Sequence, residues 1–372
     1  MLQMIAIWLL VLRLTPTCST ATNLEIAVFD WILPSPSNLP LTDLSDPSVL
    51  SAMSNTMNFF IAADHFNKRR SDILPALGLI PSTCNMNISI SMWCDTENNE
   101  YKAMSGLKNA FQMNVNALTG SASPQVILDL ALVSGALKSI PLVSSRATDT
   151  YLGNKAVYPY FARTCNDDQT YVLAITEFVR NQNYSQVVIL SSNYIDNIAF
   201  VTALQGNLAT AGIIYTSISY VDGDLNSTAT AFQNIADLEL NIIVCVAKTD
   251  SLVSMFPSLA AEYRLTTSHE KLWIFSHFDR PLYESEITTN LSLFLNNSIQ
   301  VSGKIANASL FNAYVSRWAS GEFLGNLPGM NARFPPQGYA NDSNSCVNDA
   351  SNLQIDSELY KDFIYWAQSS WG

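Results

Sequence analysis

From Leu24 onward, two patterns of apolar and polar residues take turns along the chain. Short apolar runs, typical of buried strands, are followed by segments in which apolar residues recur every three or four positions, typical of helices. In the first half, strands are expected at 24–33, 87–93, 115–118 and 140–145, and helices at 46–68, 99–111 and 124–137. Repeated strand–helix–strand units predict an α/β fold with a parallel sheet flanked by helices on both faces.

The alternation restarts after YPYFART, residues 158–164. Strands are expected at 186–192, 213–220, 241–247 and 271–278, and helices at 169–180 and 227–235 and in two segments that end at Thr210 and Arg264. This predicts a second unit of similar build. Beyond Arg280 the pattern weakens: helices are predicted at 309–320 and 357–369, and residues 341–352 are expected to form a loop.

Length, composition and charge narrow the class of protein. A chain of 372 residues with 48% hydrophobic content fits two globular units rather than one. The net charge of -12, with 19 Lys plus Arg against 31 Asp plus Glu, excludes the basic surface of a nucleic-acid-binding protein. After the first twenty residues, no apolar run approaches the ~18 residues that a membrane span needs.

Residues 1–21 are predicted to be a secretory signal peptide. An apolar run from Met4 to Leu12 precedes Ser19 and Ala21, which have the spacing of a signal-peptidase site. Because a basic leading region is missing and Arg13 ends the apolar run, a short anchor or a misassigned start stays open as an alternative. The signal predicts an extracellular or cell-surface location.

Secretion would also make the chain a glycoprotein. Acceptor triplets of the form Asn-x-Ser/Thr begin at Asn87, Asn183, Asn226, Asn290, Asn296, Asn307 and Asn341. A chain this rich in Asn, Ser and Thr produces similar numbers by chance, so their meaning depends on the signal peptide.

Cysteine positions constrain disulfide bonding. Cys18 leaves with the signal peptide, and the odd number that remains requires at least one free or intermolecular thiol. The predicted strand between Cys84 and Cys94 holds them about 30 Å apart, so they are not expected to bond to each other. Cys245 lies in an apolar strand and is predicted to be a buried thiol. The pairing of Cys84, Cys94, Cys165 and Cys346 stays open.

Motifs for catalysis or metal binding are absent from the sequence. The three histidines form no HExxH pair, and there is no CxxC, GxSxG or GxxxxGK[ST]. No GxGxxG follows the first strand. We therefore predict a protein that is not an enzyme and that carries no metal or cofactor.

Polar loops follow several of the predicted strands, where ligands bind in open α/β sheets. In TGSASP, Ser123 and Pro124 begin a helix whose free amides and positive dipole end suit a carboxylate, unless Ser123 only caps its helix. The loop SSRATD, residues 144–149, offers hydroxyls and amides to the same pocket.

Two further loops carry candidate chemistry. Asp167 and Asp168 precede a helix, where they serve either as charges on the helix dipole or as partners for a ligand ammonium. Tyr194, in SSNY after the first strand of the second unit, offers an aromatic face.

The order of TGSAS, IPLVSSRATD, YPYFART, ILSSNY and KLWIFSHFD resembles the extracellular ligand-binding region of class C G-protein-coupled receptors. These are the metabotropic glutamate and type B GABA receptors, with the receptor guanylate cyclases and bacterial amino-acid-binding proteins as more distant relatives. FNKRRSDILP followed by WCDTE looks most like the type B GABA receptors. The resemblance covers residues 24–279 and implies a two-lobed periplasmic-binding-protein (Venus flytrap) fold that closes on a ligand in the cleft.

The resemblance also implies a division of the chain. Residues 1–21 form the signal peptide, 22–165 lobe 1 with a return helix at 357–372, 166–300 lobe 2, and 301–356 the second crossing with irregular loops.

In the amino-acid-binding members of that family, two loops hold the ligand carboxylate, which implicates Ser121 or Ser123 in the first loop and Ala147 and Thr148 in the second. An acidic residue five positions after the Arg of the aromatic run holds the ammonium, and this implicates Asp168. An aromatic residue of lobe 2 covers the ligand, and Tyr194 matches its place.

The sequence departs from the family pattern at several positions. Arg146 replaces a small residue and either pairs with a ligand carboxylate or blocks the pocket. His277 stands where the glutamate receptors carry an acidic residue, and Asp279 follows two positions later. The type B GABA receptors carry a cysteine in the first loop that pairs with the one matching Cys94; here it is missing, so Cys94 is expected to lack that partner.

We therefore predict an extracellular region that binds a small amino-acid-like ligand, signals by lobe closure, and forms a homo- or heterodimer through lobe 1. Membrane attachment would come only from a downstream region that this sequence does not contain. Alternatives are a secreted solute-binding or decoy protein, a receptor guanylate cyclase ectodomain with a peptide ligand held between subunits, and an α/β enzyme that uses the same cleft.

Overall fold

A computed structural model describes residues 22–30, 58–72, 74–81, 84–96, 99–120, 123–276, 286–302 and 346–348. The chain divides into two compact units. Unit 1 comprises Met1–Cys165 and Ile305–Gly372, and unit 2 comprises Asn166–Lys304.

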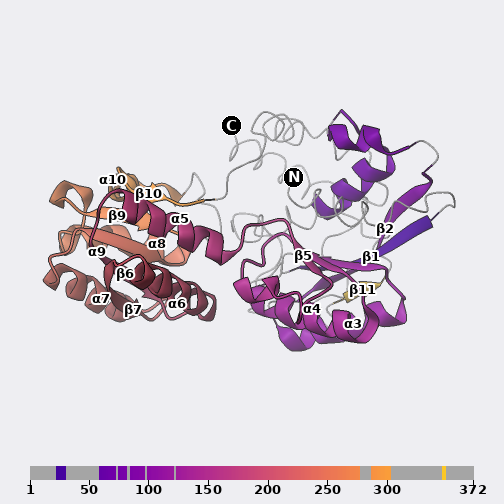
Figure 1. Cartoon of the computed structure of the whole chain (residues 1–372), viewed down its shortest axis with the longest axis horizontal. Coiled ribbons are helices and arrows are strands. Elements are labelled where there is room, and N and C mark those ends of the chain that lie inside the picture. Colours follow the sequence, from indigo (N-terminus) through magenta and orange to yellow (C-terminus); the bar gives the residue numbers. More distant parts are fainter. Residues whose placement is uncertain are drawn as a thin grey trace. The chain divides into compact units, whose positions relative to one another are not determined.

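Unit 1 is built on a six-stranded sheet in the order β11-β2-β1-β3-β4-β5 (Figure 1). The strands are β1 (Thr22–Asp30), β2 (Met86–Asp95), β3 (Ala117–Gly120), β4 (Leu142–Ser144), β5 (Phe161–Arg163) and β11 (Cys346–Asn348). Neighbouring strands are parallel, except that β11 runs antiparallel to β2. The parallel strands grow outward from β1 in both directions, as in doubly wound folds.

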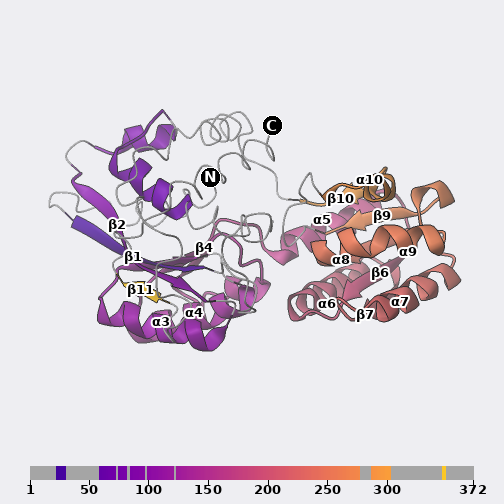
Figure 2. The ribbon, with the colours of Figure 1, turned by 180° about the vertical axis from the view of Figure 1, so that it is seen from behind.

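Helices α3 and α4 lie against the same face of this sheet, as the view from behind shows (Figure 2). The helical segments described in unit 1 are residues 58–67, η2 (Pro75–Leu79), α3 (Glu100–Gln112), α4 (Pro124–Lys138) and η3 (Thr150–Gly153). Asn99 caps α3, and its side chain accepts a hydrogen bond from the Lys102 amide at 3.1 Å. Apolar residues of both helices, such as Leu107 and Leu130, pack on Phe29 in one core.

Polar side chains close the outer edge of β2 where β11 does not reach. The Asn67 amide exchanges two hydrogen bonds with the backbone of Ile88, at 2.8 and 2.7 Å. Arg69 donates to the carbonyls of Cys84 at 3.1 Å and Met86 at 2.7 Å. Because an open strand edge invites pairing with another chain, these side chains protect the sheet.

Gly120, the last residue of β3, permits a close approach to β1. It pairs with Phe29, and a Cβ atom at Gly120 would lie 1.8 Å from the Phe29 carbonyl oxygen. Since no side chain fits in that space, this strand contact requires glycine.

Unit 2 contains a five-stranded, all-parallel sheet in the order β10-β9-β8-β6-β7. Its strands are β6 (Gln186–Ser192), β7 (Ile214–Tyr220), β8 (Ile242–Val246), β9 (Leu272–Phe275) and β10 (Ile299–Gln300). Its helices are α5 (Asp168–Asn181), α6 (Ile195–Thr210), α7 (Leu225–Asp237), α8 (Thr249–Ser254), α9 (Phe256–Glu262), η4 (Thr267–His269) and α10 (Thr289–Leu295).

The two faces of the unit 2 sheet carry separate cores. On β6, Val187 and Ile189 pack with residues of α5 and α6, whereas Val188 and Leu190 face α7, α9 and α10. The second face is rich in aromatic rings, with Trp273 stacked on Phe275 at 5.9 Å between ring centroids. This alternation follows from the two-residue period of a strand and explains why the strands are almost continuously apolar.

The predicted fold class is confirmed, since both units have mainly parallel sheets flanked by helices. Two predictions were wrong. Residues 341–352 were expected to form a loop, but β11 lies within them, because pairing with β2 makes a strand of three residues that have no strand pattern. The helix expected to end at Arg264 is two helices, α8 and α9, because Pro257 has no amide to continue the hydrogen bonding.

Other elements were missed or cannot be compared. The sequence did not predict β5 or α10, both of which are short. The predicted signal peptide and the helices at 309–320 and 357–369 lie outside the described residues.

The cysteines make bonds that the sequence left open. Cys84 and Cys94 are both disulfide-bonded, so Cys94 has a partner other than the first-loop cysteine that this sequence lacks. Since β2 lies between these two residues, each pairs with a different cysteine. The register of β11 places Cys346 opposite Cys94. Cys245 is a buried free thiol, as predicted, and Cys165 is also free.

Candidate functional site

In unit 1, the residues predicted from the first loop lie at the end of β3 and the start of α4. Ser123 is the N-cap residue of α4 and Pro124 occupies its first turn, as predicted. Ser123 has the N-cap position, but its side chain accepts no hydrogen bond from the amides of the first turn and therefore does not cap the helix. Ser121 lies outside the described residues.

The second loop is organised by Ser144, the buried last residue of β4. The Ser144 hydroxyl donates to the Gly120 carbonyl at 3.1 Å and accepts hydrogen bonds from the Arg146 and Ala147 amides at 3.3 and 3.2 Å. These bonds tie the loop to the end of β3. Ser144 therefore shapes the loop rather than facing a ligand.

Arg163, the last residue of β5, supports the same loop from the other side. Its guanidinium donates to the carbonyls of Ala147 at 3.2 Å and Asp149 at 2.7 Å. The Asp149 carboxylate in turn accepts the Tyr151 amide at 2.7 Å as the cap of η3. The loop is thus held at its start, middle and end.

The three predicted ligand residues of this loop differ in exposure. Ala147 is fully buried, and its amide is used by Ser144, so its side chain belongs to the core. Thr148 is half-buried, and its hydroxyl has no hydrogen-bond partner among the described residues. Arg146 is exposed, which places a cation on this edge of the sheet.

Two further hydroxyls at the same edge lack partners. Ser145 follows β4 and Thr164 follows β5, and the Thr164 amide donates to the Ser144 carbonyl at 3.0 Å. Both hydroxyl oxygens are buried, and within the described residues neither makes a hydrogen bond. Because buried polar atoms are normally satisfied, this edge has unused capacity for polar contacts.

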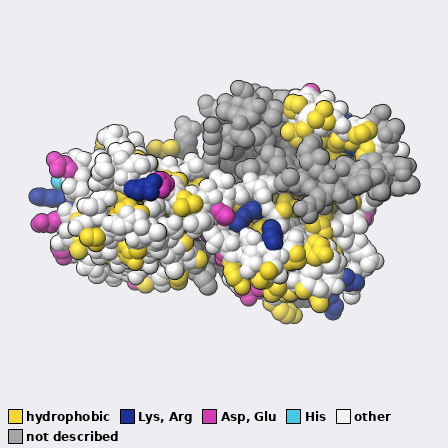
Figure 3. All heavy atoms as spheres, in the orientation of Figure 1, with side chains coloured by type: hydrophobic (Ala, Val, Ile, Leu, Met, Phe, Trp, Pro, Cys, Tyr) yellow, Lys and Arg dark blue, Asp and Glu magenta, His cyan; other side chains and the backbone are white. Residues whose placement is uncertain are grey.

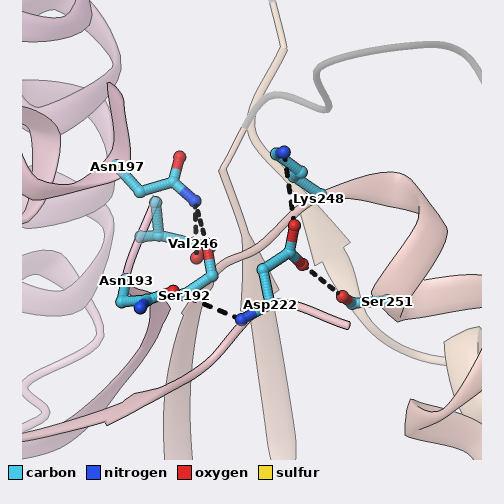
Figure 4. Close-up of polar contacts among 7 residues, drawn as sticks. All are labelled: Ser192, Asn193, Asn197, Asp222, Val246, Lys248 and Ser251. Atoms are coloured by element: carbon cyan, nitrogen blue, oxygen red, sulfur yellow. Dashed lines mark hydrogen bonds and ion pairs between the residues drawn. The ribbon is translucent and has the colours of Figure 1, made fainter. Parts of the chain in front are cut away.

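In unit 2, three adjacent strands each place a polar or aromatic residue two positions beyond their last residue. Tyr194 follows β6, Asp222 follows β7 and Lys248 follows β8. Lys248 donates to the Asp222 carboxylate at 3.2 Å (Figure 4), and its ammonium lies 3.6 Å from the centroid of the Tyr194 ring. The three side chains therefore form one contact group, which we call the strand-end triad.

Neighbouring groups fix the Asp222 arm of the strand-end triad (Figure 4). Ser251, on α8, donates from its hydroxyl to the second carboxylate oxygen of Asp222 at 2.6 Å. The Asp222 amide donates to the side-chain carbonyl of Asn193 at 3.2 Å.

Asn197, on α6, links the ends of β6 and β8. Its amide nitrogen donates to the Ser192 hydroxyl at 2.7 Å and to the Val246 carbonyl at 3.4 Å. These bonds join the strand ends that carry Tyr194 and Lys248.

A buried layer lies beneath the strand-end triad. Burial raises the pKa of the Tyr220 hydroxyl, and the neighbouring Cys245 thiol raises it further. Burial also raises the pKa of Cys245 itself. Both groups stay protonated at neutral pH, so neither supplies a base or a nucleophile.

The remaining predicted residues of unit 2 lie at its start or outside the described part. Asp167 caps α5 and accepts the Thr170 amide at 3.0 Å, so it directly precedes a helix, as predicted. Asp168 is the first residue of α5 and is 6% exposed. His277, two positions beyond β9, and Asp279 lie outside the described residues.

Neither a metal cluster nor a membrane span is found in the described segments. No group of three or more His, Cys, Asp or Glu side chains comes together there in a way that suits a metal ion. Among the helices of those segments, none has both the length and the apolar character needed to cross a bilayer.

The sequence identified Tyr194 and the loop that begins at Ser144, but it missed Asp222, Lys248 and the contacts of Arg163 with that loop. Their relationship depends on sheet order and on where each strand ends, and no local motif marks them. Counting two positions beyond each predicted strand end would have found Asp222.

Comparison with known proteins assigns a family. A search of curated proteins finds no significant match. Residues 61–349 match the model of the receptor family ligand binding region, a periplasmic-binding-protein-like domain found in class C G-protein-coupled receptors. Since this match spans well over half of the chain and the fold agrees with it, the chain belongs to the receptor family ligand binding region.

Proposed function

We propose that this chain is the extracellular ligand-binding region of a cell-surface receptor and that it binds a small amino-acid-like ligand. The observation that carries the proposal is the position of polar side chains at the carboxyl ends of strands in both units. Thr148 in unit 1 and Lys248 in unit 2 both follow the carboxyl end of a strand and are partly exposed. Ligands bind at such ends in open α/β sheets.

Each candidate residue has a proposed role. The hydroxyls of Ser121 or Ser123 and of Thr148 hold the ligand carboxylate, and Ala147 keeps their loop in place from the core. Asp168 holds the ammonium. Tyr194, His277 and Asp279 contribute contacts from unit 2, and Arg146 pairs with an acidic group of the ligand.

Signalling follows from a population shift between open and closed arrangements of the lobes. A ligand that contacts both units stabilises the closed arrangement only by its higher affinity for it. We expect the radius of gyration from small-angle X-ray scattering to fall when the ligand saturates the protein. An unchanged radius at saturation would contradict lobe closure while leaving ligand binding in place.

The binding residues are tested with a double variant, Thr148→Ala with Asp168→Ala. Thermal shift with a panel of amino acids first identifies the ligand, because binding to the native state alone raises its melting temperature. The double variant should lose at least about 100-fold in affinity, since a carboxylate contact and an ammonium contact each contribute ~1.5–3 kcal/mol.

A matched control uses the same residue types at the opposite edge of the unit 2 sheet. Thr210 ends α6 and Asp237 ends α7, and both are exposed. Thr210→Ala with Asp237→Ala should bind as the wild type does. Unchanged affinity in the Thr148/Asp168 variant would reject the site assignment.

Glycosylation is a further part of the proposal. All five acceptor asparagines in the described residues are exposed: Asn87, Asn183, Asn226, Asn290 and Asn296. Protein secreted from animal cells should lose mass in several steps when it is digested with an N-glycosidase. A mass equal to that of the bare chain would contradict glycosylation.

We also propose that unit 1 pairs with a second copy of this chain through the α4 surface. Hydrophobic side chains gather on the lower part of unit 1 in Figure 3, and Leu132 and Leu137 of α4 are 43% and 68% exposed. Leu137→Glu should convert a dimer into a monomer in sedimentation velocity. A wild type that sediments as a monomer at micromolar concentration would contradict pairing.

A further inference from the structure

The strand-end triad of unit 2 has a feature that bears on the charge of the ligand. Sheet order places β6 between β8 and β7, so Lys248 must reach across the end of β6 to pair with Asp222. Neighbouring strands lie about 4.8 Å apart, which makes this a span of roughly 10 Å. Tyr194, at the end of β6, lies under that span, and the ammonium rests 3.6 Å from its ring centroid.

One face of the Tyr194 ring is therefore taken by a cation of the protein itself. The ring quadrupole attracts an ammonium over its face, and Lys248 already occupies that position. A ligand ammonium that approached this face would have to displace Lys248 and would meet its positive charge.

The Lys248 ammonium still has hydrogen-bonding capacity. It carries three N–H donors, and Asp222 accepts from it at 3.2 Å. The Lys248 side chain is 26% exposed, so it is only partly covered by the rest of unit 2. Asp222 cannot turn away from it, because the Ser251 hydroxyl holds the other carboxylate oxygen at 2.6 Å.

We propose that Lys248 determines the charge specificity of unit 2: it excludes cationic ligand groups from the Tyr194 face that it covers and provides a contact for an anionic group. The inference rests on the proposed function and adds the class of ligand, an amino acid with a second acidic group. Unit 1 carries a second exposed cation, Arg146, at the carboxyl edge of its own sheet. Each unit thus carries a basic residue at the carboxyl edge of its own sheet, which favours an anionic ligand group there.

The test uses three probes of similar size and different side-chain charge: L-glutamate, L-glutamine and L-2,4-diaminobutyrate. Isothermal titration calorimetry should give the wild type at least a tenfold preference for glutamate over glutamine. Lys248→Met keeps the length of the stem and removes the charge, so the preference should fall to near one and diaminobutyrate should gain affinity.

Asp222→Asn provides the opposite change. It releases Lys248 from its carboxylate partner, so the affinity for glutamate should rise several-fold. A merely structural role for the pair would move both variants in the same direction, whereas charge selection moves them in opposite directions. Lys271→Met is the matched control, because Lys271 precedes β9 at the other edge of the sheet and donates to the Leu240 carbonyl.

The outcomes separate this inference from the proposed function. A wild type that binds the probes without a preference for glutamate, or a Lys248→Met variant that keeps that preference, overturns the role of Lys248 and leaves ligand binding standing. A wild type that binds none of the three probes at millimolar concentration overturns amino-acid binding and the role of Lys248 together.

Discussion

At the carboxyl edge of the unit 1 sheet, the loop at residues 144–149 is held by Ser144 and Arg163, mostly through bonds to the backbone. At the same edge of unit 2, the strand-end triad holds itself together through a charge pair and an aromatic ring. The first design makes a rigid loop with hydroxyls on it. The second makes a charged surface whose strength depends on salt and on the charge of the ligand. The same fold thus offers two kinds of contact, and each can be disturbed separately.

The largest effect is expected from Gly120→Ala, which would disrupt the pairing of β3 with β1 in the unit 1 sheet. Its Cβ would lie 1.8 Å from the Phe29 carbonyl oxygen, so β1 and β3 would have to separate. We expect a loss of more than about 4 kcal/mol in the free energy of unfolding, measured by urea denaturation.

Gly206→Ala is the control for that variant. Gly206 lies inside α6, and nothing is found within 4 Å of its added Cβ. This change should be neutral or stabilise unit 2 by up to ~1 kcal/mol. Equal stability in the two variants would show that the close approach of β1 and β3 does not constrain unit 1.

Arg163→Ala should come next, since it removes the charged donor that the unit 1 loop shares between two carbonyls. A charge-assisted hydrogen bond is worth ~1.5–3 kcal/mol, so we expect a loss of about 2 kcal/mol in the free energy of unfolding. Amide exchange at residues 146–149 should speed up, while exchange in unit 2 stays unchanged. Protection of the loop at wild-type levels would contradict the role of Arg163.

Alkaline pH should destabilise unit 2 through Cys245. Burial raises the pKa of this thiol in the folded protein. In the unfolded chain the thiol ionises near pH 8.5, so above that pH only the unfolded state loses the proton and stability falls. The loss should reach about 1.4 kcal/mol by pH 9.5.

Cys245→Val tests this pH dependence. It should flatten the stability curve between about pH 8.5 and 9.5 relative to the wild type. The buried Tyr220 should add a further loss above roughly pH 10, which the variant keeps. Parallel curves for variant and wild type would rule out Cys245 as the source.

The smallest expected effect is on the coupling free energy between Lys248 and Asp222, and its dependence on salt distinguishes the unit 2 edge from the unit 1 edge. Lys248 and Asp222 are 26% and 25% exposed, so a double-mutant cycle with Lys248→Met and Asp222→Asn should give a coupling of only about 0.5 kcal/mol. The coupling should weaken further in 1 M salt, where charges are screened. Ser144→Ala in unit 1, which removes no charge, should cost the same at low and high salt.

Sequence patterns predicted the parts of the fold that a single chain segment determines. The strand at 186–192 has the predicted bounds, because apolar residues and polar flanks mark both of its ends. By contrast, β5 and β11 have three residues each and exist through pairing with β4 and β2, which no local pattern records.

The candidate site shows the same limit. Tyr194 stood out as an aromatic residue after a strand. Lys248 and Asp222 are separated by 26 positions, and they meet only because β8 and β7 both pair with β6, so that one lysine side chain can reach across its end. Arg163 was used to locate Asp168, yet its contacts with the loop at 144–149 depend on the pairing of β4 with β5. Residues acquire such roles from the topology.

The side chains that close the edge of β2 protect the chain against aggregation through its strand edges. Asn67 matches both backbone groups of Ile88, as a residue of a neighbouring strand would. Arg69 covers the next two carbonyls toward the start of β2. A growing stack of misassembled chains needs a strand edge on which to add its next member. With one amide and one guanidinium, unit 1 removes that starting point along the half of β2 that β11 leaves open.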